Sequence, residues 1–320
     1  MDLVTGAGGF LGRALVGRLV ADGVAVRAML HRGGDPPAGA EPVRAALEDA
    51  DSLRRAATGC ATVFHLAARV HDPGAREDAF QAANVGGTAS LLAAARDAGA
   101  AAFVFVSSVK AMGEGGDACL DEDAPAVPVS PYGRSKLEAE ELVRAAGAHG
   151  GLRVSILRLP LVYGAGLKGN LSAMLDAVAR GLFPPLPRVP NRRSLASVAD
   201  AVNACVLAAR NPAAAGRTYL VTDGAAYSSR EIYDDMREAL GKPPVRWSVP
   251  LGALRAAAAA GDALAPLSGG RAVFGRDALA KLLGSAWYAN VRIRKELGFA
   301  PATTLRAALP EIVAARRRAR

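Results

Sequence analysis

The chain has 320 residues, a formal net charge of +9, 5% aromatic residues and three widely spaced cysteines without a C-x-x-C pair. The length suffices for one large domain plus a smaller lobe, and the cysteine spacing predicts neither a disulfide framework nor a metal site. The chain carries no long uncharged apolar stretch and opens directly on a strand and a glycine turn. We therefore expect a soluble, cytoplasmic protein without a transmembrane segment.

Part of the positive charge lies at the C-terminus, in the run Arg316-Arg317-Arg318-Ala319-Arg320. A nucleic-acid site would interleave basic residues with stacking aromatic residues, and the sequence has no such motif. We interpret the tail as a solvated basic segment and expect no nucleic-acid partner. Basic character also suits an anionic small substrate.

The first element in the chain is a short buried strand, Asp2 to Thr5, followed by a glycine turn and a helix that carries Leu15 and Leu19. Glycines in such a turn let the backbone approach a pyrophosphate, whose charge then lies at the N-terminus of the helix. A strand, this turn and a helix in that order predict dinucleotide binding. The predicted contacts are Gly6, Gly8, Gly9, Phe10, Leu11 and Gly12.

The second predicted strand, Ala25 to Leu30, ends in His31 and Arg32. An NAD-binding protein usually places a carboxylate here to hold the ribose hydroxyls. Arg32, helped by Arg27 or His31, could instead bind a 2′-phosphate, which favours NADP over NAD. Arg32 could equally be an ordinary surface arginine.

Strands and helices continue to alternate along the next eighty residues. We predict strands at Pro42 to Ala46, Thr62 to Leu66 and Phe103 to Ser107, with helices near Ser52 to Ala57 and from about Asp78 to Ala98. This rhythm predicts an α/β fold with a Rossmann-type, doubly wound parallel sheet, whose ligands bind at the carboxyl ends of the strands.

Small and polar residues follow those strand ends. Leu66, Ala67 and Ala68 would let the adenosine half of a cofactor lie against the backbone, and Ser108 would place a hydroxyl near the reacting oxygen. Asn84 would anchor the central helix beside the cofactor, or would only brace the backbone.

The segment Ser130 to Lys136 predicts the start of a helix, with Ser130 as N-cap and Pro131 as the first helical residue. Tyr132 and Lys136 then share one helix face, and the nearby ammonium, together with the helix dipole, should lower the phenol pKa. Such a tyrosine can exchange a proton with a carbonyl oxygen. Taken alone, the pair could also be an exposed tyrosine and lysine.

Six motifs occur in a fixed order: Thr5-Gly6-x-x-Gly9-x-x-Gly12, His65-Leu66-Ala67-Ala68, Asn84-Val85-x-Gly87-Thr88, Val106-Ser107-Ser108, Tyr132-x-x-x-Lys136 and Arg158-x-Pro160-x-Val162-Tyr163-Gly164. Together they resemble the extended short-chain dehydrogenase/reductases, the NAD-dependent epimerase/dehydratase family. The resemblance implies that Ser108, Tyr132 and Lys136 are catalytic and that Lys136 also holds the nicotinamide ribose. The further cofactor contacts that we predict are His31, Arg32, Leu47, Leu66, Ala67, Ala68, Asn84, Val106, Tyr132, Lys136 and Pro160.

The same resemblance extends to a substrate side. Asn170 and Arg193 resemble the asparagine and the arginine that contact the substrate diphosphate in nucleotide-sugar enzymes of the family. Asn170 could also be a helix cap and Arg193 a surface charge. The predicted substrate contacts are Ser108, Lys110, Asn170 and Arg193, and the predicted substrate is a UDP-linked sugar.

The reaction type follows from which residues are missing. Sugar dehydratases of this family carry an Asp-Glu pair just after the catalytic hydroxyl residue, where this chain has Val109-Lys110. Hydride transfer at C4 of the sugar remains. The segment Ser107 to Glu114 looks most like the O-antigen enzymes that reduce UDP-4-keto-6-deoxy-N-acetylhexosamine, and we expect this activity.

Three alternatives stay open. One is a UDP-glucose or UDP-N-acetylglucosamine 4-epimerase with tightly bound NAD, although Leu30 and Ala46 occupy positions where those enzymes carry acidic residues. Another is a reductase of flavonoids or steroids, whose pocket should be apolar. The last is a non-catalytic NAD(P)-binding regulator, which would commonly lose the tyrosine or the lysine.

We expect residues 1–165 plus 193–222 to form the cofactor domain, and residues 166–192 plus 223–320 to form a smaller substrate lobe. Within the lobe, Pro184 to Pro187 predicts a stiff surface loop, Ser228 to Glu231 predicts a helix start, and Trp287 and Tyr288 should pack the lobe or line the sugar site. The resemblance also implies a homodimer built from the long helices near 78–98 and 131–148.

Overall fold

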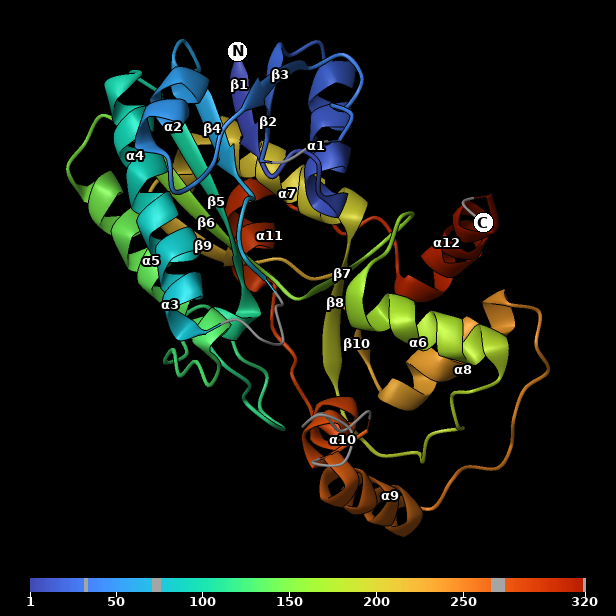
Figure 1. The fold of residues 1–320 in the computed structure, drawn as a ribbon. Helices are drawn as coiled ribbons and strands as arrows, with labels where there is room; N and C mark the ends of the chain where they lie inside the picture. Colours follow the sequence, from blue (N-terminus) through green and yellow to red (C-terminus); the bar gives the residue numbers. More distant parts are fainter. Residues whose placement is uncertain (32–33, 71–75, 266–273, 319–320) are drawn as a thin grey trace.

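The computed structural model describes residues 1–31, 34–70, 76–265 and 274–318. Its largest unit is a seven-stranded sheet of order β3-β2-β1-β4-β5-β6-β9, in which all neighbouring strands are parallel (Figure 1). The strands are β1 (Asp2–Thr5), β2 (Val26–Leu30), β3 (Glu41–Arg44), β4 (Thr62–His65), β5 (Ala102–Ser108), β6 (Arg153–Leu159) and β9 (Arg217–Leu220). The strand order reverses between β1 and β4, and ligands bind at this point in doubly wound sheets.

Helices cover both faces of the sheet, each over its own apolar core (Figure 1). One face carries α1 (Phe10–Ala21), α7 (Val198–Arg210) and α11 (Val291–Leu297), with the short turn η3 (Pro212–Ala214) beside them. The other carries α2 (Ala50–Ala57), α4 (Gly87–Asp97) and α5 (Pro131–Ala148). Because both faces are buried, the strands are nearly continuous apolar runs, as in Phe103 to Val106.

A smaller region lies beyond the carboxyl ends of these strands. It contains a three-stranded sheet of order β10-β8-β7, made of β7 (Leu161–Tyr163), β8 (Arg193–Ser197) and β10 (Ala226–Tyr227). Its helices are α6 (Gly169–Arg180), α8 (Ser229–Ala239), α9 (Leu251–Leu264), α10 (Arg276–Leu283) and α12 (Leu305–Arg318). Helices α6, α8 and α12 share an apolar core that contains Leu171, Tyr233 and Leu309.

This architecture confirms the predicted Rossmann-type doubly wound fold with a smaller C-terminal region. Helix α8 begins at the predicted place, because Ser228 and Glu231 form a capping box. The segment from β8 to β9 is shared between the two sheets. Strand β8 joins the small sheet, whereas α7 packs on the large sheet and β9 is the edge strand of the large sheet.

One local expectation was incomplete and another was wrong. The long helix expected from Asp78 to Ala98 is present over nearly this range, but a π-helical turn η1 (Gln81–Gly86) separates α3 (Glu77–Phe80) from α4. The loop from Pro184 to Pro187, which was expected at the surface, is largely covered, because Leu186 is fully buried against Leu254 and Ala258 of α9. Periodicity does not reveal a π turn, and a proline-rich segment does not reveal that a distant helix packs over it.

Over the described ranges, no helix is long and apolar enough to span a membrane. The same ranges contain no group of three or more histidine, cysteine or acidic side chains arranged to hold a metal ion.

Candidate active site

Helix α5 begins beside the residues that follow β5. Ser130 caps the helix by accepting a hydrogen bond from the amide of Gly133 at 3.0 Å, and Pro131 occupies its first turn. A Cβ atom on Gly133 would lie 2.3 Å from the carbonyl oxygen of Lys110. Only glycine permits this close approach, which brings Tyr132 next to the end of β5.

Ser108 is the last residue of β5 and caps the short 3₁₀ turn η2 (Val109–Ala111). Its hydroxyl oxygen accepts a hydrogen bond from the Lys110 amide at 3.2 Å. The hydroxyl also forms a hydrogen bond with the phenol of Tyr132. The structure therefore brings the predicted serine and tyrosine into direct contact.

Tyr132 does not have the lowered pKa that the sequence predicts. Burial raises its pKa to about 12, and the hydrogen bond with Ser108 opposes this rise only in part. Desolvation of the phenolate therefore dominates. At neutral pH the phenol of the ligand-free protein is therefore protonated.

Lys136 does not lower the pKa of Tyr132, because its ammonium points toward β5. Its Nζ donates a hydrogen bond to the carbonyl oxygen of Val106 at 2.9 Å and lies 3.9 Å from the ring centroid of Phe105. Burial lowers the pKa of Lys136 to about 7, while the nearby carboxylate of Glu140 acts in the opposite direction. A lysine in this environment exchanges its proton close to physiological pH.

Beneath Lys136 lies a buried ion pair that the sequence analysis missed. Glu140 follows Lys136 by one helical turn, is fully buried, and accepts hydrogen bonds from Ser107 at 2.6 Å and from Arg158 at 2.7 Å. Arg144 contributes a further bond at 2.6 Å. This network ties α5 to β5 and β6. Its only sequence signal is the spacing of Glu140 four residues after Lys136.

Asn84 braces the opposite side of the same helix turn. Its side-chain carbonyl accepts a hydrogen bond from the Arg69 amide at 2.8 Å, while its Nδ2 donates to the Arg69 carbonyl and to the Ser135 hydroxyl at 3.0 Å and 2.9 Å. Ser135 in turn donates to the carbonyl of Tyr132 at 2.9 Å. Asn84 lies in the π turn η1, and π turns are frequent at functional sites. The side chain has the bracing role that the sequence also allowed.

The ends of β1 and β4 are joined by a chain of buried polar groups. Thr5 accepts hydrogen bonds from the amides of Leu66 and Ala67 at 3.1 Å and 3.0 Å, and it contacts Nδ1 of His65 at 2.9 Å. On its other side, Nε2 of His65 contacts the Thr88 hydroxyl at 3.0 Å. Burial lowers the pKa of His65 to about 3, so the ring is neutral. Leu66, Ala67 and Ala68 follow as half-buried residues at the switch point.

The glycine turn fits a dinucleotide pyrophosphate. Gly6 has a left-handed φ of 67°, and a Cβ on Gly12 would lie 2.1 Å from the Gly6 carbonyl. Helix α1 starts after Gly9 with no side chain capping its first turn and no acidic residue within it. The amides of that turn, which include those of Phe10, Leu11 and Gly12, are thus directed at an anion site.

The residues that would distinguish NADP from NAD are only partly in place. His31 is exposed at the end of β2, and Arg32 lies outside the described residues. Arg27 cannot assist, because its guanidinium is held by Glu41 at 2.8 Å and by the carbonyls of α2 near the other end of the strand. Arg13, which the sequence analysis missed, donates to the carbonyls of Gly8 and Asp35 at 3.2 Å and 2.9 Å. Arg13 thus places a guanidinium at this edge of the sheet.

The other predicted cofactor contacts have different surroundings. Leu47 is buried, and its side chain packs against the Cα of Gly87, where a Cβ would lie 2.6 Å away. Val106 is half-buried and supplies the carbonyl that holds Lys136. Pro160 is half-buried after β6.

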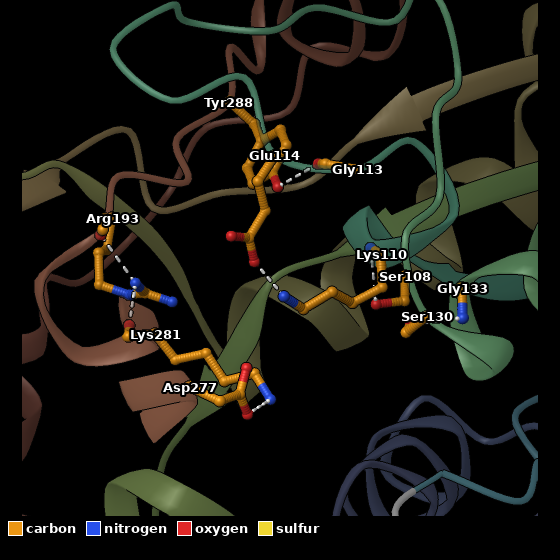
Figure 2. A network of polar contacts seen from close by, with 11 residues as sticks. Ser108, Lys110, Gly113, Glu114, Ser130, Gly133, Arg193, Asp277, Lys281 and Tyr288 are labelled. Carbon is orange, nitrogen blue, oxygen red and sulfur yellow. Dashed lines mark hydrogen bonds and ion pairs between the residues drawn. The ribbon is translucent and has the colours of Figure 1, made fainter. Parts of the chain in front are cut away.

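Charged residues lie near Ser108, among them Lys110, Glu114 and Arg193 (Figure 2). Lys110 forms an ion pair with Glu114, and their side chains are 39% and 31% exposed. Arg193, at the start of β8, donates to the carbonyls of Lys281 and Gly284. Tyr288 is buried and donates to the carbonyl of Gly113 at 2.8 Å. Asn170 is exposed in the first turn of α6, whose N-cap is Lys168.

A family model described as the NAD dependent epimerase/dehydratase family matches residues 3–222. A ketoreductase from Stigmatella aurantiaca that acts on a 4-farnesyl-3,4-dihydroquinoline-1-oxide is 32% identical over 94% of this chain and 92% of its own length. A UDP-glucose 4-epimerase from Vibrio cholerae is 35% identical over 59% of this chain and 60% of its own length. Among solved structures, MoeE5 in complex with UDP-glucuronic acid and NAD is 28% identical, with a TM-score of 0.78 over 100% of this chain and 99% of that one.

Proposed function

The chain belongs to the NAD dependent epimerase/dehydratase family, and from this premise we propose that it reduces the C4 carbonyl of a UDP-4-keto-6-deoxy-hexosamine with NADPH. The members that it resembles are epimerases, dehydratases and reductases, so the chain is an enzyme of the extended short-chain dehydrogenase/reductase type. Its solved neighbours bind NAD, and the preference for NADP is part of our proposal.

The observation that carries this proposal is a cluster of three charged side chains near Ser108. Lys110, Glu114 and Arg193 lie close to one another, and Lys110 follows Ser108 by two residues (Figure 2). Cations and a carboxylate suit a sugar diphosphate, through charge-assisted hydrogen bonds, better than they suit an apolar ketone.

The protonation states of the site favour reduction. A phenol with a pKa of about 12 holds its proton at neutral pH, so Tyr132 is ready to donate it to a carbonyl oxygen that Ser108 also contacts. Lys136, one turn further along α5, has a pKa of about 7 and can therefore return a proton to the site after the phenol has given up its own. When bound, the nicotinamide supplies the hydride.

The proposal divides the chain between two tasks. Residues 1–165 plus 193–222 hold the dinucleotide, with the glycine turn and the end of β4 as its floor. Residues 166–192 plus 223–320 close over the sugar nucleotide, which Asn170 of this lobe and Arg193 of the neighbouring strand β8 would contact. A homodimer through the helices near 78–98 and 131–148 remains our expectation for the assembly.

A second candidate function is reduction of an apolar ketone. It is favoured by the Stigmatella aurantiaca ketoreductase, because that relative matches along nearly the whole chain. The epimerase alternative is favoured by the Vibrio cholerae enzyme. The three functions differ in substrate and in whether the cofactor is consumed.

The deciding experiment is to denature freshly purified protein and identify any released nucleotide by mass spectrometry. The emptied protein is then assayed with NADPH or NADH and a UDP-4-keto-6-deoxy-N-acetylhexosamine, following absorbance at 340 nm. We expect no retained nucleotide and stoichiometric oxidation of NADPH. Tightly retained NAD with interconversion of UDP-glucose and UDP-galactose would indicate the epimerase. Turnover of an apolar ketone alone would contradict the sugar-nucleotide assignment.

A further inference from the structure

Arg193 is anchored on one side only. Both of its hydrogen bonds come from Nη1, which donates to the carbonyls of Lys281 at 2.6 Å and of Gly284 at 2.9 Å. The guanidinium is planar, so these two bonds fix its orientation. Among the described residues, Nε and Nη2 of Arg193 donate no hydrogen bond, and Figure 2 shows the guanidinium on the same side as Glu114.

Glu114 supplies the negative charge that faces this guanidinium. Burial lowers the pKa of Arg193, and Glu114 is the first of the charged neighbours that oppose this effect. One oxygen of the carboxylate is bonded to Lys110, and the carboxylate lies between the two cations (Figure 2). A partly buried cation is unstable without a counter-charge, and in the ligand-free protein the chain itself provides one.

This arrangement conflicts with the substrate of the proposed function. A diphosphate group would bind the same two cations, and the carboxylate of Glu114 would repel it at that distance. Glu114 must therefore move or the affinity must fall. The ion pair is about one third exposed, so an incoming anion can reach it.

The backbone around Glu114 leaves such a movement to the side chain. Glu114 is followed by Gly115 and Gly116, and a side chain at Gly116 would meet no atom within 4 Å. Gly116 has a left-handed φ of 60° and Gly113 one of 93°. On the other side, Tyr288 holds the carbonyl of Gly113 in place. The loop is thus held on both sides of Glu114, because Gly115 packs against Leu120 and accepts a hydrogen bond from the amide of Ala118 at 3.1 Å. The exchange therefore requires only that the partly exposed side chain of Glu114 rotates away from the two cations.

We propose that Glu114 is an exchangeable internal anion, which neutralises Lys110 and Arg193 in the free protein and gives them up when the substrate diphosphate binds. The inference rests on the proposed function for the identity of the incoming anion. Exchange of one anion for another keeps the two cations paired in both states. It also rejects neutral ligands, which cannot replace the displaced carboxylate.

The test is a set of binding titrations by calorimetry, with the cofactor site saturated by the dinucleotide that the protein prefers. UDP and inorganic pyrophosphate are titrated into the wild-type protein and into Glu114→Gln, Arg193→Met and Asp277→Asn. The last is the matched control, because Asp277 forms a similar i, i+4 pair with Lys281 on the surface of α10. Thermal unfolding of each variant verifies that it folds.

We expect Glu114→Gln to bind both ligands about twofold to fivefold more tightly, which corresponds to removal of one partly exposed ion pair. Arg193→Met should bind at least about tenfold more weakly, and Asp277→Asn should match the wild type. Unchanged or weaker binding of UDP by Glu114→Gln would overturn the inference and leave the proposed function intact. Binding of pyrophosphate but not UDP, with the same gain in Glu114→Gln, would support the exchange and contradict the nucleotide-sugar substrate. If neither ligand binds any of the proteins, the inference is wrong.

Discussion

The cofactor side and the substrate side of this enzyme handle polar groups in opposite ways. Around the switch point, Thr5, His65 and Thr88 are buried and bonded to one another, and Gly12 leaves no space for a larger side chain. Around Arg193, the polar groups carry full charges and are partly exposed, and one of them, Glu114, lies between glycines. In our proposal, the first arrangement positions the dinucleotide, and the second changes its partners when a substrate binds. Substitutions around the switch point should therefore lower the free energy of unfolding, whereas substitutions around Arg193 should weaken substrate binding.

The largest effect is expected at Tyr132, where the two sides meet. Tyr132→Phe keeps the ring but removes the proton that the carbonyl oxygen requires. We expect kcat to fall by about 10²-fold to 10⁴-fold, while the dissociation constant of the dinucleotide stays unchanged. Stopped-flow assays and fluorescence titration with NADPH measure the two quantities. Undiminished turnover would exclude Tyr132 as the acid.

The next effect separates two glycines of helix α1. A Cβ at Gly12 would lie 2.1 Å from the Gly6 carbonyl, whereas a Cβ at Gly17 meets nothing within 4 Å. Gly12→Ala should destabilise the protein by about 1–3 kcal/mol through overpacking, and it should weaken dinucleotide binding. Gly17→Ala should stabilise the protein by about 0.5–1 kcal/mol through helix propensity. Urea denaturation measures both free energies of unfolding, and equal effects would mean that the turn is not tightly packed.

A pH-dependent effect is expected from His65. Its pKa is about 3 in the folded protein, against an ordinary value of 6.5. The unfolded chain binds the extra proton below pH 6.5, so stability is complete above this pH and is lost as the pH falls toward 3. Each pH unit between 6.5 and 3 lowers the free energy of unfolding by about 1.4 kcal/mol. His65→Asn should be less stable at neutral pH but should flatten the slope of unfolding free energy between pH 6.5 and 4.5. An unchanged slope would assign the acid sensitivity to other groups.

The fold was predictable from local signals, because the strand ends and the glycine turn lie in continuous stretches of sequence. The boundaries of β1 and the start of α5 follow from Asp2, Ser130 and Pro131 without any distant contact. The site was less predictable. The approach of Gly133 to Lys110 and the position of Glu114 near Arg193 join residues from different parts of the chain, and no spacing rule encodes them.

The pKa of Tyr132 was also not predictable from local sequence. The spacing between Tyr132 and Lys136 correctly placed both residues on one helix, but it predicted a lowered pKa where burial raises it. Helical spacing identifies neighbours, but it does not show that the lysine bonds to a strand carbonyl or that the phenol is desolvated. Burial is a property of the folded chain as a whole, so a pKa is harder to predict from sequence than a strand.

The smallest effect on stability, and the one that tests the contrast most directly, is expected at Lys110. Its ion pair with Glu114 is partly exposed, so Lys110→Met should change the free energy of unfolding by less than about 1 kcal/mol. The backbone amide that holds Ser108 is unaffected by this change, so kcat should remain close to that of the wild type. KM for the sugar nucleotide should rise severalfold, because one of the two cations facing the diphosphate is lost. Steady-state kinetics at constant ionic strength separate kcat from KM. A large loss of stability with unchanged KM would place Lys110 with the rigid cofactor side and would remove the distinction between the two regions.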